Sequence, residues 1–246
     1  MTAASDAFLV GAGVVAGIVG TGGGITSLVS YPALLSVGLP PLAADVANLV
    51  ALVACWPGSA LSSRRELTGS GRWLARGLPL AALGAAGGAL LLLTTPSGLF
   101  ERLVPVLLAA GSLALLCQPV LTRRLHARRG HVLALPVVAT VSVYSGYFGA
   151  GAGVLLLATL LVLVDQRLPE ANAVKNMLNG AATVAAAAVL VCAGPVVWAA
   201  VVPLAAGLFV GATLGPIVVR HLPATVVRVA VAALGLGLAV RLAFAA

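Results

Sequence analysis

The sequence predicts an all-α polytopic membrane protein of two homologous halves, each with about four to five helical segments and a helical hairpin broken by glycine. Three observations predict this fold class. The chain of 246 residues is 61% hydrophobic and 8% charged, with a mean hydropathy of +1.14. Its apolar residues form long runs, and a glycine-rich motif of the first half returns in the second half.

The low charge content excludes the main soluble classes. A soluble domain carries about 25% charged residues, and 14 Lys+Arg with 6 Asp+Glu cannot cover a globule of 246 residues. A soluble enzyme, a nucleic-acid-binding domain and a disordered protein are therefore excluded, despite the net charge of +8. A β-barrel is excluded too, because its strands alternate apolar and polar residues and these runs do not.

The apolar runs predict the helical segments in order. We place them at 7–20, 24–37, 42–62, 76–94, 103–121, 132–148, 153–164, 170–193, 196–219 and 222–243. A full crossing takes about 20 apolar residues. Segments 24–37 and 153–164 are shorter than this, and each follows a glycine cluster, so we expect the broken hairpins there.

The basic residues lie in the gaps between these runs. One gap holds Arg64, Arg65, Arg72 and Arg76, and another holds Arg123, Arg124, His126, Arg128, Arg129 and His131. Short basic loops are typical of the cytoplasmic side of a membrane protein. We predict a first transmembrane repeat at 1–121, a basic cytoplasmic loop at 122–131 and a second transmembrane repeat at 132–246. The expected location is the cytoplasmic (inner) membrane, with several crossings.

The two glycine clusters indicate an internal duplication. Gly17, Gly20, Gly22 and Gly24 align, with identical spacing, with Gly146, Gly149, Gly151 and Gly153. Leu39-Pro40 matches Leu168-Pro169 in the same register, and Asn48 matches Asn176 after a slip of one position. This continued match argues against chance similarity between glycine-rich segments. If each broken hairpin crosses the membrane twice or not at all, each half has an odd number of crossings, and the repeats are inverted. If the broken segment crosses once, the repeats are parallel. We favour the inverted arrangement.

The glycine clusters are the expected binding site. Glycine destabilises a helix by about 1 kcal/mol relative to alanine, and an interrupted backbone is tolerated in a membrane only beside protein or a cavity. Such a break presents a helix N-terminus whose amide groups attract an anion. The alternative is close helix packing, which we expect for Gly13 with Gly17 and for Gly84 with Gly88.

Two polar stretches follow the clusters. Lys175, the only lysine, shares a helix face with Asn179, whereas Asn176 flanks it. An intramembrane lysine usually lines a functional cavity, although it can also extend to the surface from near a helix end. We therefore expect a small anion to be bound by Gly20, Thr21, Gly22, Gly23, Gly24, Asn48, Gly149, Gly151, Gly153, Lys175, Asn176 and Asn179.

Asp45 is the candidate coupling residue. It could pair with Lys175 or carry a coupling proton, or it could simply favour the first turn of a helix that starts at Pro41. The isolated cysteines have no spacing suited to a metal site, and we expect no metal and no cofactor.

These residues resemble the TauE/SafE family of sulfite exporters, also called toluene sulfonate uptake permeases. The resemblance lies in Gly17-x-x-Gly20-x-Gly-Gly-Gly24, Pro32 and Leu39-Pro40-Pro41, in the second copy at 146–153 with Pro169, and in Arg64-Arg65-Glu66-Leu67 and Lys175-Asn176…Asn179. It covers nearly the whole chain. It implies a small secondary permease for sulfite, sulfonates or related sulfur-containing anions.

A secondary transporter is therefore the expected function, with the lipid bilayer and a small inorganic or organic anion as partners and a homodimer as a further option. A passive anion channel or a non-transporting membrane scaffold is the alternative. We expect no nucleic-acid partner, because the basic residues lie in short loops between apolar runs. We expect no enzyme activity, because His126, His131 and His221 all lie in predicted loops, away from any intramembrane nucleophile.

Overall fold

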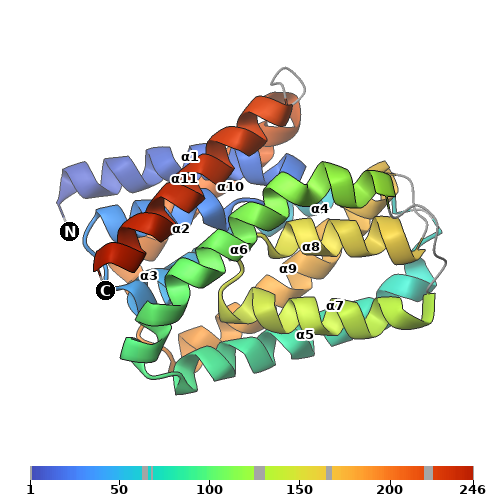
Figure 1. The fold of residues 1–246 in the computed structure, drawn as a ribbon, viewed down its shortest axis with the longest axis horizontal. Helices are drawn as coiled ribbons and strands as arrows, with labels where there is room; N and C mark the ends of the chain where they lie inside the picture. The colour runs from blue at the N-terminus through green and yellow to red at the C-terminus, as the bar shows by residue number, and fades with distance from the viewer. Residues whose placement is uncertain are drawn as a thin grey trace.

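A computed structural model describes residues 2–62, 66–67, 69–124, 131–164, 168–218 and 224–245. Within these ranges the chain is helical and contains no strand. The first half comprises α1 (Ala3–Gly23), α2 (Ser27–Ser36), α3 (Pro41–Ala51), the 3-10 turn η1 (Leu52–Cys55), α4 (Trp56–Ser62), α5 (Gly71–Thr94) and α6 (Ser97–Arg124). The second comprises α7 (His131–Tyr147), α8 (Ala152–Thr159), the π-helical η2 (Leu160–Val164), α9 (Leu168–Ala193), α10 (Trp198–Val218) and α11 (Ala224–Ala245) (Figure 1).

The described helices confirm a polytopic membrane protein. Seven of the described stretches are long and apolar enough to cross a membrane. The shorter apolar helices are Ser27–Ser36, Leu133–Tyr147 and Ala152–Val164. Each predicted apolar run coincides with a helix, once α3, η1 and α4 are taken as one segment and α8 and η2 as another. Arg64, Arg65, His126, Arg128, Arg129 and His221 lie outside the described residues.

Glycine breaks a helical hairpin in each half, but later in the first cluster than expected. α1 continues helically through Gly20 and ends only at Gly24, whose φ of 67° is left-handed and whose amide donates to the Gly20 carbonyl oxygen. In the second half, α7 ends at Tyr147, and Gly149 and Gly151 take φ values of 76° and 79°. Glycine adopts such angles without a steric penalty.

The two halves interlock in an arrangement that repeats itself. α1 packs along α10, and α5 packs along α7. In the duplication, α7 is the equivalent of α1 and α10 is the equivalent of α5, so these two pairs are equivalent contacts. α6 packs against its own counterpart, α11. Both termini lie at the left end of the bundle in Figure 1. The halves therefore form one helical body, in which each supplies helices to the other.

Small residues allow these close crossings, as expected for two glycine pairs. A Cβ on Gly13 would lie 2.5 Å from the Leu204 carbonyl oxygen of α10, and one on Gly84 would lie 2.7 Å from the Ala139 carbonyl oxygen of α7. Such backbone contact is how small residues drive helix association in lipid. The packing role predicted for Gly13 and Gly84 is confirmed.

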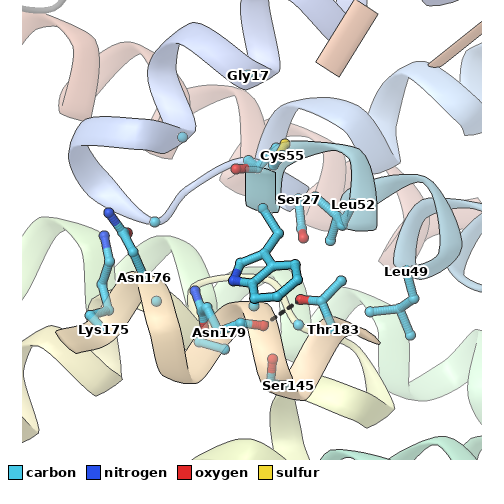
Figure 2. A pocket seen from close by; sticks show the side chains of 18 residues that line it. Gly17, Ser27, Leu49, Leu52, Cys55, Ser145, Lys175, Asn176, Asn179 and Thr183 are labelled. Carbon is cyan, nitrogen blue, oxygen red and sulfur yellow. Dashed lines mark hydrogen bonds between the residues drawn. The ribbon is translucent and has the colours of Figure 1, made fainter. Parts of the chain in front are cut away.

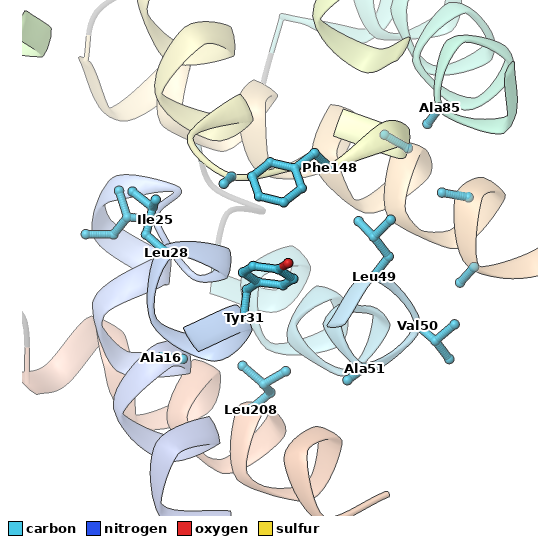
Figure 3. Packing of buried hydrophobic residues seen from close by; sticks show 14 of the residues in the cluster. Ala16, Ile25, Leu28, Tyr31, Leu49, Val50, Ala51, Ala85, Phe148 and Leu208 are labelled. Carbon is cyan, nitrogen blue, oxygen red and sulfur yellow. The ribbon is translucent and has the colours of Figure 1, made fainter. Parts of the chain in front are cut away.

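Aromatic packing holds the second break against the first hairpin. Tyr31 of α2 and Phe148, which directly precedes Gly149, meet edge to face with ring centroids 5.3 Å apart. Figure 3 shows the two rings next to each other, with Leu49 of α3 beside them. Both aromatic side chains are fully buried. This contact fixes the position of the unwound stretch 148–151 relative to α2.

Candidate functional site

The two glycine breaks meet in the interior of the bundle. A Cβ on Gly24 would lie 2.7 Å from the Gly153 Cα atom, so the end of α1 touches the first turn of α8 backbone to backbone. Both glycines line one cavity of about 80 Å³ (Figure 2). One water needs roughly 10–15 Å³ by this measure. The cavity therefore has room for several waters or one small polyatomic anion.

Residues from both halves line this cavity. Of those predicted from the sequence, it is lined by Gly20, Gly24, Gly149, Gly153, Lys175, Asn176 and Asn179. The lining residues that the sequence reasoning did not select are Gly17, Thr26, Ser27, Leu49, Leu52, Cys55, Trp56, Ser145, Ala152, Gly180 and Thr183. Figure 2 shows α9 on one side of the cavity and the α1 and η1 segments on the other.

Other predicted residues are placed elsewhere. Gly151 packs against α6, where an added Cβ would lie 2.9 Å from the Gly111 Cα atom. Close packing and its positive φ therefore explain why this position is a glycine. Asn48 is fully buried and does not line the cavity, because its side chain faces Ser30 of α2. Asp45 is also buried away from the lining. Thr21, Gly22 and Gly23 form the last turn of α1, and the structure does not describe whether they line the cavity.

Lys175 is the positive charge of the cavity. Its side chain is 1% exposed, so it does not extend to the surface. Its Nζ atom donates a 2.7 Å hydrogen bond to Asn172 Oδ1, a neutral acceptor. The considered ion pair with Asp45 does not form, since both Asp45 carboxyl oxygens have no hydrogen-bond partner among the described residues. Among the described residues, no acidic group is therefore paired with the Lys175 amino group.

Asn179 and Gly153 add polar groups beside this charge. Asn179 Oδ1 is buried without a hydrogen-bond partner among the described residues, and Asn179 Nδ2 lies close to Gly153. The amides of Ala152 and Val154 donate to carbonyl oxygens of the preceding turn, whereas that of Gly153 has no such acceptor in the described ranges. A cation and an unpaired amide at a helix N-terminus suit an anion.

The opposite wall contains a tryptophan. Trp56, at the start of α4, rests its indole ring directly on Gly180 of α9, which has no Cβ to hold it away. Its side chain is 39% exposed, unlike the buried lysine. The sequence signal was present, because Trp56-Pro57-Gly58 interrupts an apolar run, but only the packing of α4 on α9 brings the indole to the cavity.

Comparison with known proteins decides the family. The family model described as "Sulfite exporter TauE/SafE" matches residues 7–242. The chain belongs to this family. The resemblance inferred from the two glycine clusters is thereby confirmed over almost the whole chain.

Similar members of the TauE/SafE family come from several bacteria. A probable membrane transporter protein of Haemophilus influenzae is 28% identical over 215 residues, which cover 84% of this chain and 81% of that protein. The probable membrane transporter protein YfcA of Escherichia coli K12 is 28% identical over 212 residues, covering 83% and 75%. The probable membrane transporter protein ORF9 of Sinorhizobium sp is 28% identical over 242 residues, covering 96% and 91%.

This TauE/SafE chain is therefore a multi-pass membrane transporter. No solved structure matches it significantly. In the described ranges of this TauE/SafE protein, no group of three or more His, Cys, Asp or Glu side chains could hold a metal ion.

Proposed function

We propose that this protein is a secondary permease of the cytoplasmic membrane for sulfite or another small sulfur-containing or organosulfonate anion. The observation that carries the proposal is Lys175, a buried lysine without an acidic partner among the described residues, in the cavity where the two glycine breaks meet. A buried cation is costly unless a negative charge compensates it. A bound anion supplies that charge.

The anion is held between groups of both halves. Lys175 Nζ and the Gly153 amide donate to it from the second half, while the Gly24 backbone borders the cavity from the first. The absence of a Cβ at both glycines lets ligand oxygens approach the backbone closely. Asn176 and Asn179 contribute amide side chains at the same face of α9. Affinity for one small anion therefore depends on both halves.

An inverted arrangement of the two repeats in the membrane completes the proposal. Two observations support it: the equivalent pairs α1 with α10 and α7 with α5, and the position of both termini at one end of the bundle. If the five segments of each half alternate in direction, the second half begins at the end of the bundle opposite to the first. Rocking of such halves around a shared central site alternately opens it to either side.

Transport by purified protein in liposomes tests this function. Sulfite, sulfate, thiosulfate, methanesulfonate and sulfoacetate are offered in a concentration series, and each is also tested for thermal stabilisation of the protein. We expect saturable uptake and stabilisation by at least one sulfur oxyanion. Flux that does not saturate identifies a channel, and neither flux nor stabilisation with any of these anions contradicts the proposal.

Variants of Lys175 connect the flux to the cavity. Lys175→Met removes the charge and keeps the apolar stem, so we expect it to abolish saturable transport while the protein stays folded. Arg102→Met removes an exposed positive charge of α6 and is the matched control, with transport as in the wild type. Unchanged transport by Lys175→Met excludes the proposed site.

A further inference from the structure

A second ionisable group is buried beside the cavity without lining it. The Asp45 side chain is 0% exposed, and neither carboxyl oxygen has a hydrogen-bond partner among the described residues. An unpaired carboxylate in an apolar interior is strongly unfavourable, and acidic groups in membrane spans usually serve ion or proton movement. In this conformation, no described group compensates a negative charge on Asp45.

Polar groups lie between Asp45 and the cavity. Asn48 lies one turn after Asp45 on the same face of α3, and its Nδ2 atom is also buried without a partner in the described ranges. Ser30 Oγ donates a 2.5 Å hydrogen bond to Asn48 Oδ1 and lies 3.0 Å from the Thr26 carbonyl oxygen. Thr26 lines the cavity. From the cavity to the carboxyl, the groups are therefore the Thr26 backbone carbonyl, Ser30, Asn48 and Asp45. The last two are not hydrogen-bonded to each other in this conformation.

The other ionisable groups around α3 leave Asp45 unpaired. The phenol groups of Tyr31 on α2 and Tyr144 on α7 are close enough to interact with it electrostatically. The packed neighbours carry Lys175 and Glu170 on α9, Glu101 and Arg102 on α6 and Cys55 on η1, whereas α10 carries no charged side chain. None of these described groups is hydrogen-bonded to the Asp45 carboxyl oxygens. A proton on the carboxyl group is thus the remaining way to neutralise it.

We propose that Asp45 is a proton-binding site that couples proton movement to anion transport through Asn48 and Ser30. This inference rests on the proposed function, whose anion site it complements. The step is a simple ionisation: the neutral carboxylic acid releases a proton to cavity water and becomes a carboxylate, and the reverse reaction restores it. With Asp45 neutral, Lys175 balances a bound monovalent anion; with Asp45 ionised, the carboxylate opposes the anion. Proton and anion therefore bind together.

The acid Asp45 and the base Lys175 lie on equivalent helices of the duplication. α3 and α9 are equivalent helices of the two halves. The acid of α3 is Asp45, whereas α9 carries Lys175, with Glu170 in its first turn. Lys175 lines the cavity, and Asp45 is placed behind its wall. One half thus supplies the anion-binding charge and the other the proton-binding group.

Infrared spectroscopy tests the proton site without any transported anion. A pH-jump difference spectrum of the purified full-length protein should show the band of a protonated carboxyl group. We expect Asp45→Asn to lose this band and Glu101→Gln, which alters an exposed carboxyl group of α6, to retain it. A band that persists unchanged in Asp45→Asn overturns the proposal.

Transport of methanesulfonate tests the coupling. This anion keeps its charge over the whole working pH range, so proton movement reported by a pH-sensitive dye inside the liposomes belongs to the protein. We expect Asp45→Asn to lose proton uptake at least about tenfold, equivalent to 1.4 kcal/mol, while anion counterflow persists. Wild-type proton uptake by this variant, loss of counterflow as well, or a requirement for a sodium gradient in the wild type overturns the coupling role.

Two further outcomes separate this inference from the proposed function. If the wild type moves no methanesulfonate, the proposed function fails for sulfonates, and the infrared band alone decides on the proton site. If Asp45→Asn does not fold, Ser30→Ala keeps the carboxyl group and removes the hydroxyl that contacts Asn48. We expect this variant to slow proton uptake more than anion counterflow, and equal effects on both contradict the proposed path.

Discussion

Gly24 at the end of α1 and Gly153 in the first turn of α8 touch through their backbones, and a Cβ on either would lie 2.7 Å from the other's Cα atom. The two residues are equivalent positions of the duplication, each the last glycine of its cluster. The contact therefore joins the two halves at their glycine breaks, beside the cavity. Any side chain at this point separates the halves or fills the site.

Replacement of Gly24 tests this contact. Gly24→Ala introduces a Cβ against Gly153 at a φ of 67°, where L-residues are strained. We expect the protein to lose about 1–3 kcal/mol of stability or more, which lowers Tm by about 2–4 °C per kcal/mol in a chain of this size. Gly11→Ala on the same helix has no atom within 4 Å of its new Cβ. This control should melt at or slightly above the wild-type temperature, and an unchanged Tm in Gly24→Ala contradicts the contact.

Packing glycines should affect stability without changing the affinity of the folded protein for its anion. Gly88→Ala places a Cβ into the Val143 carbonyl group of α7, whereas Gly87→Ala, at the preceding position, meets nothing within 4 Å. We expect Gly88→Ala to be destabilised by about 1–3 kcal/mol and Gly87→Ala to resemble the wild type. Thermal unfolding measures the first effect, and anion titration of the folded fraction the second. Equal stability of the two variants refutes the close α5–α7 crossing.

The Trp56 contact with Gly180 predicts a change in cavity access. Gly180→Ala inserts a methyl group where the indole ring now lies, so Trp56 must move. We expect an altered tryptophan emission spectrum, and faster reaction of Cys55, which also lines the cavity, with a soluble thiol reagent. A Trp56→Phe background identifies how much of the emission change belongs to this residue. Unaltered emission and labelling show that the indole does not close the cavity wall.

A negative charge introduced at position 179 should weaken anion binding. Asn179 lies beside Gly153 and lines the cavity with Lys175. Asn179→Asp keeps the shape of the side chain and adds a negative charge, so we expect the anion Kd to rise at least about tenfold, or 1.4 kcal/mol. Asn179→Leu, of similar size and uncharged, separates the loss of the amide from the added charge. An equal or tighter Kd in Asn179→Asp argues against an anion in this cavity.

Much of the site could be predicted because its signals are local. The density of glycine at 17–24 and 146–153 indicates an interrupted helix, whatever the packing of the helices. A lone lysine in an apolar run indicates a buried charge. Of the nine predicted binding residues whose surroundings the structure describes, seven consequently line the cavity. The residue at which the first helix ends could not be predicted, because a helix tolerates several glycines before its cap: α1 continues to Gly23.

The sequence alone determined the class of protein, the order of the apolar helices and the existence of two related halves, because hydropathy and repeated spacing are properties of the chain itself. Tertiary structure decided which groups meet. Trp56 reaches Gly180, and Asp45 stays apart from Lys175, because helix crossings between distant segments set these distances. Gly151 shows the same limit: its conformation is encoded locally, but its partner, Gly111, belongs to α6 of the other half and is found only by packing.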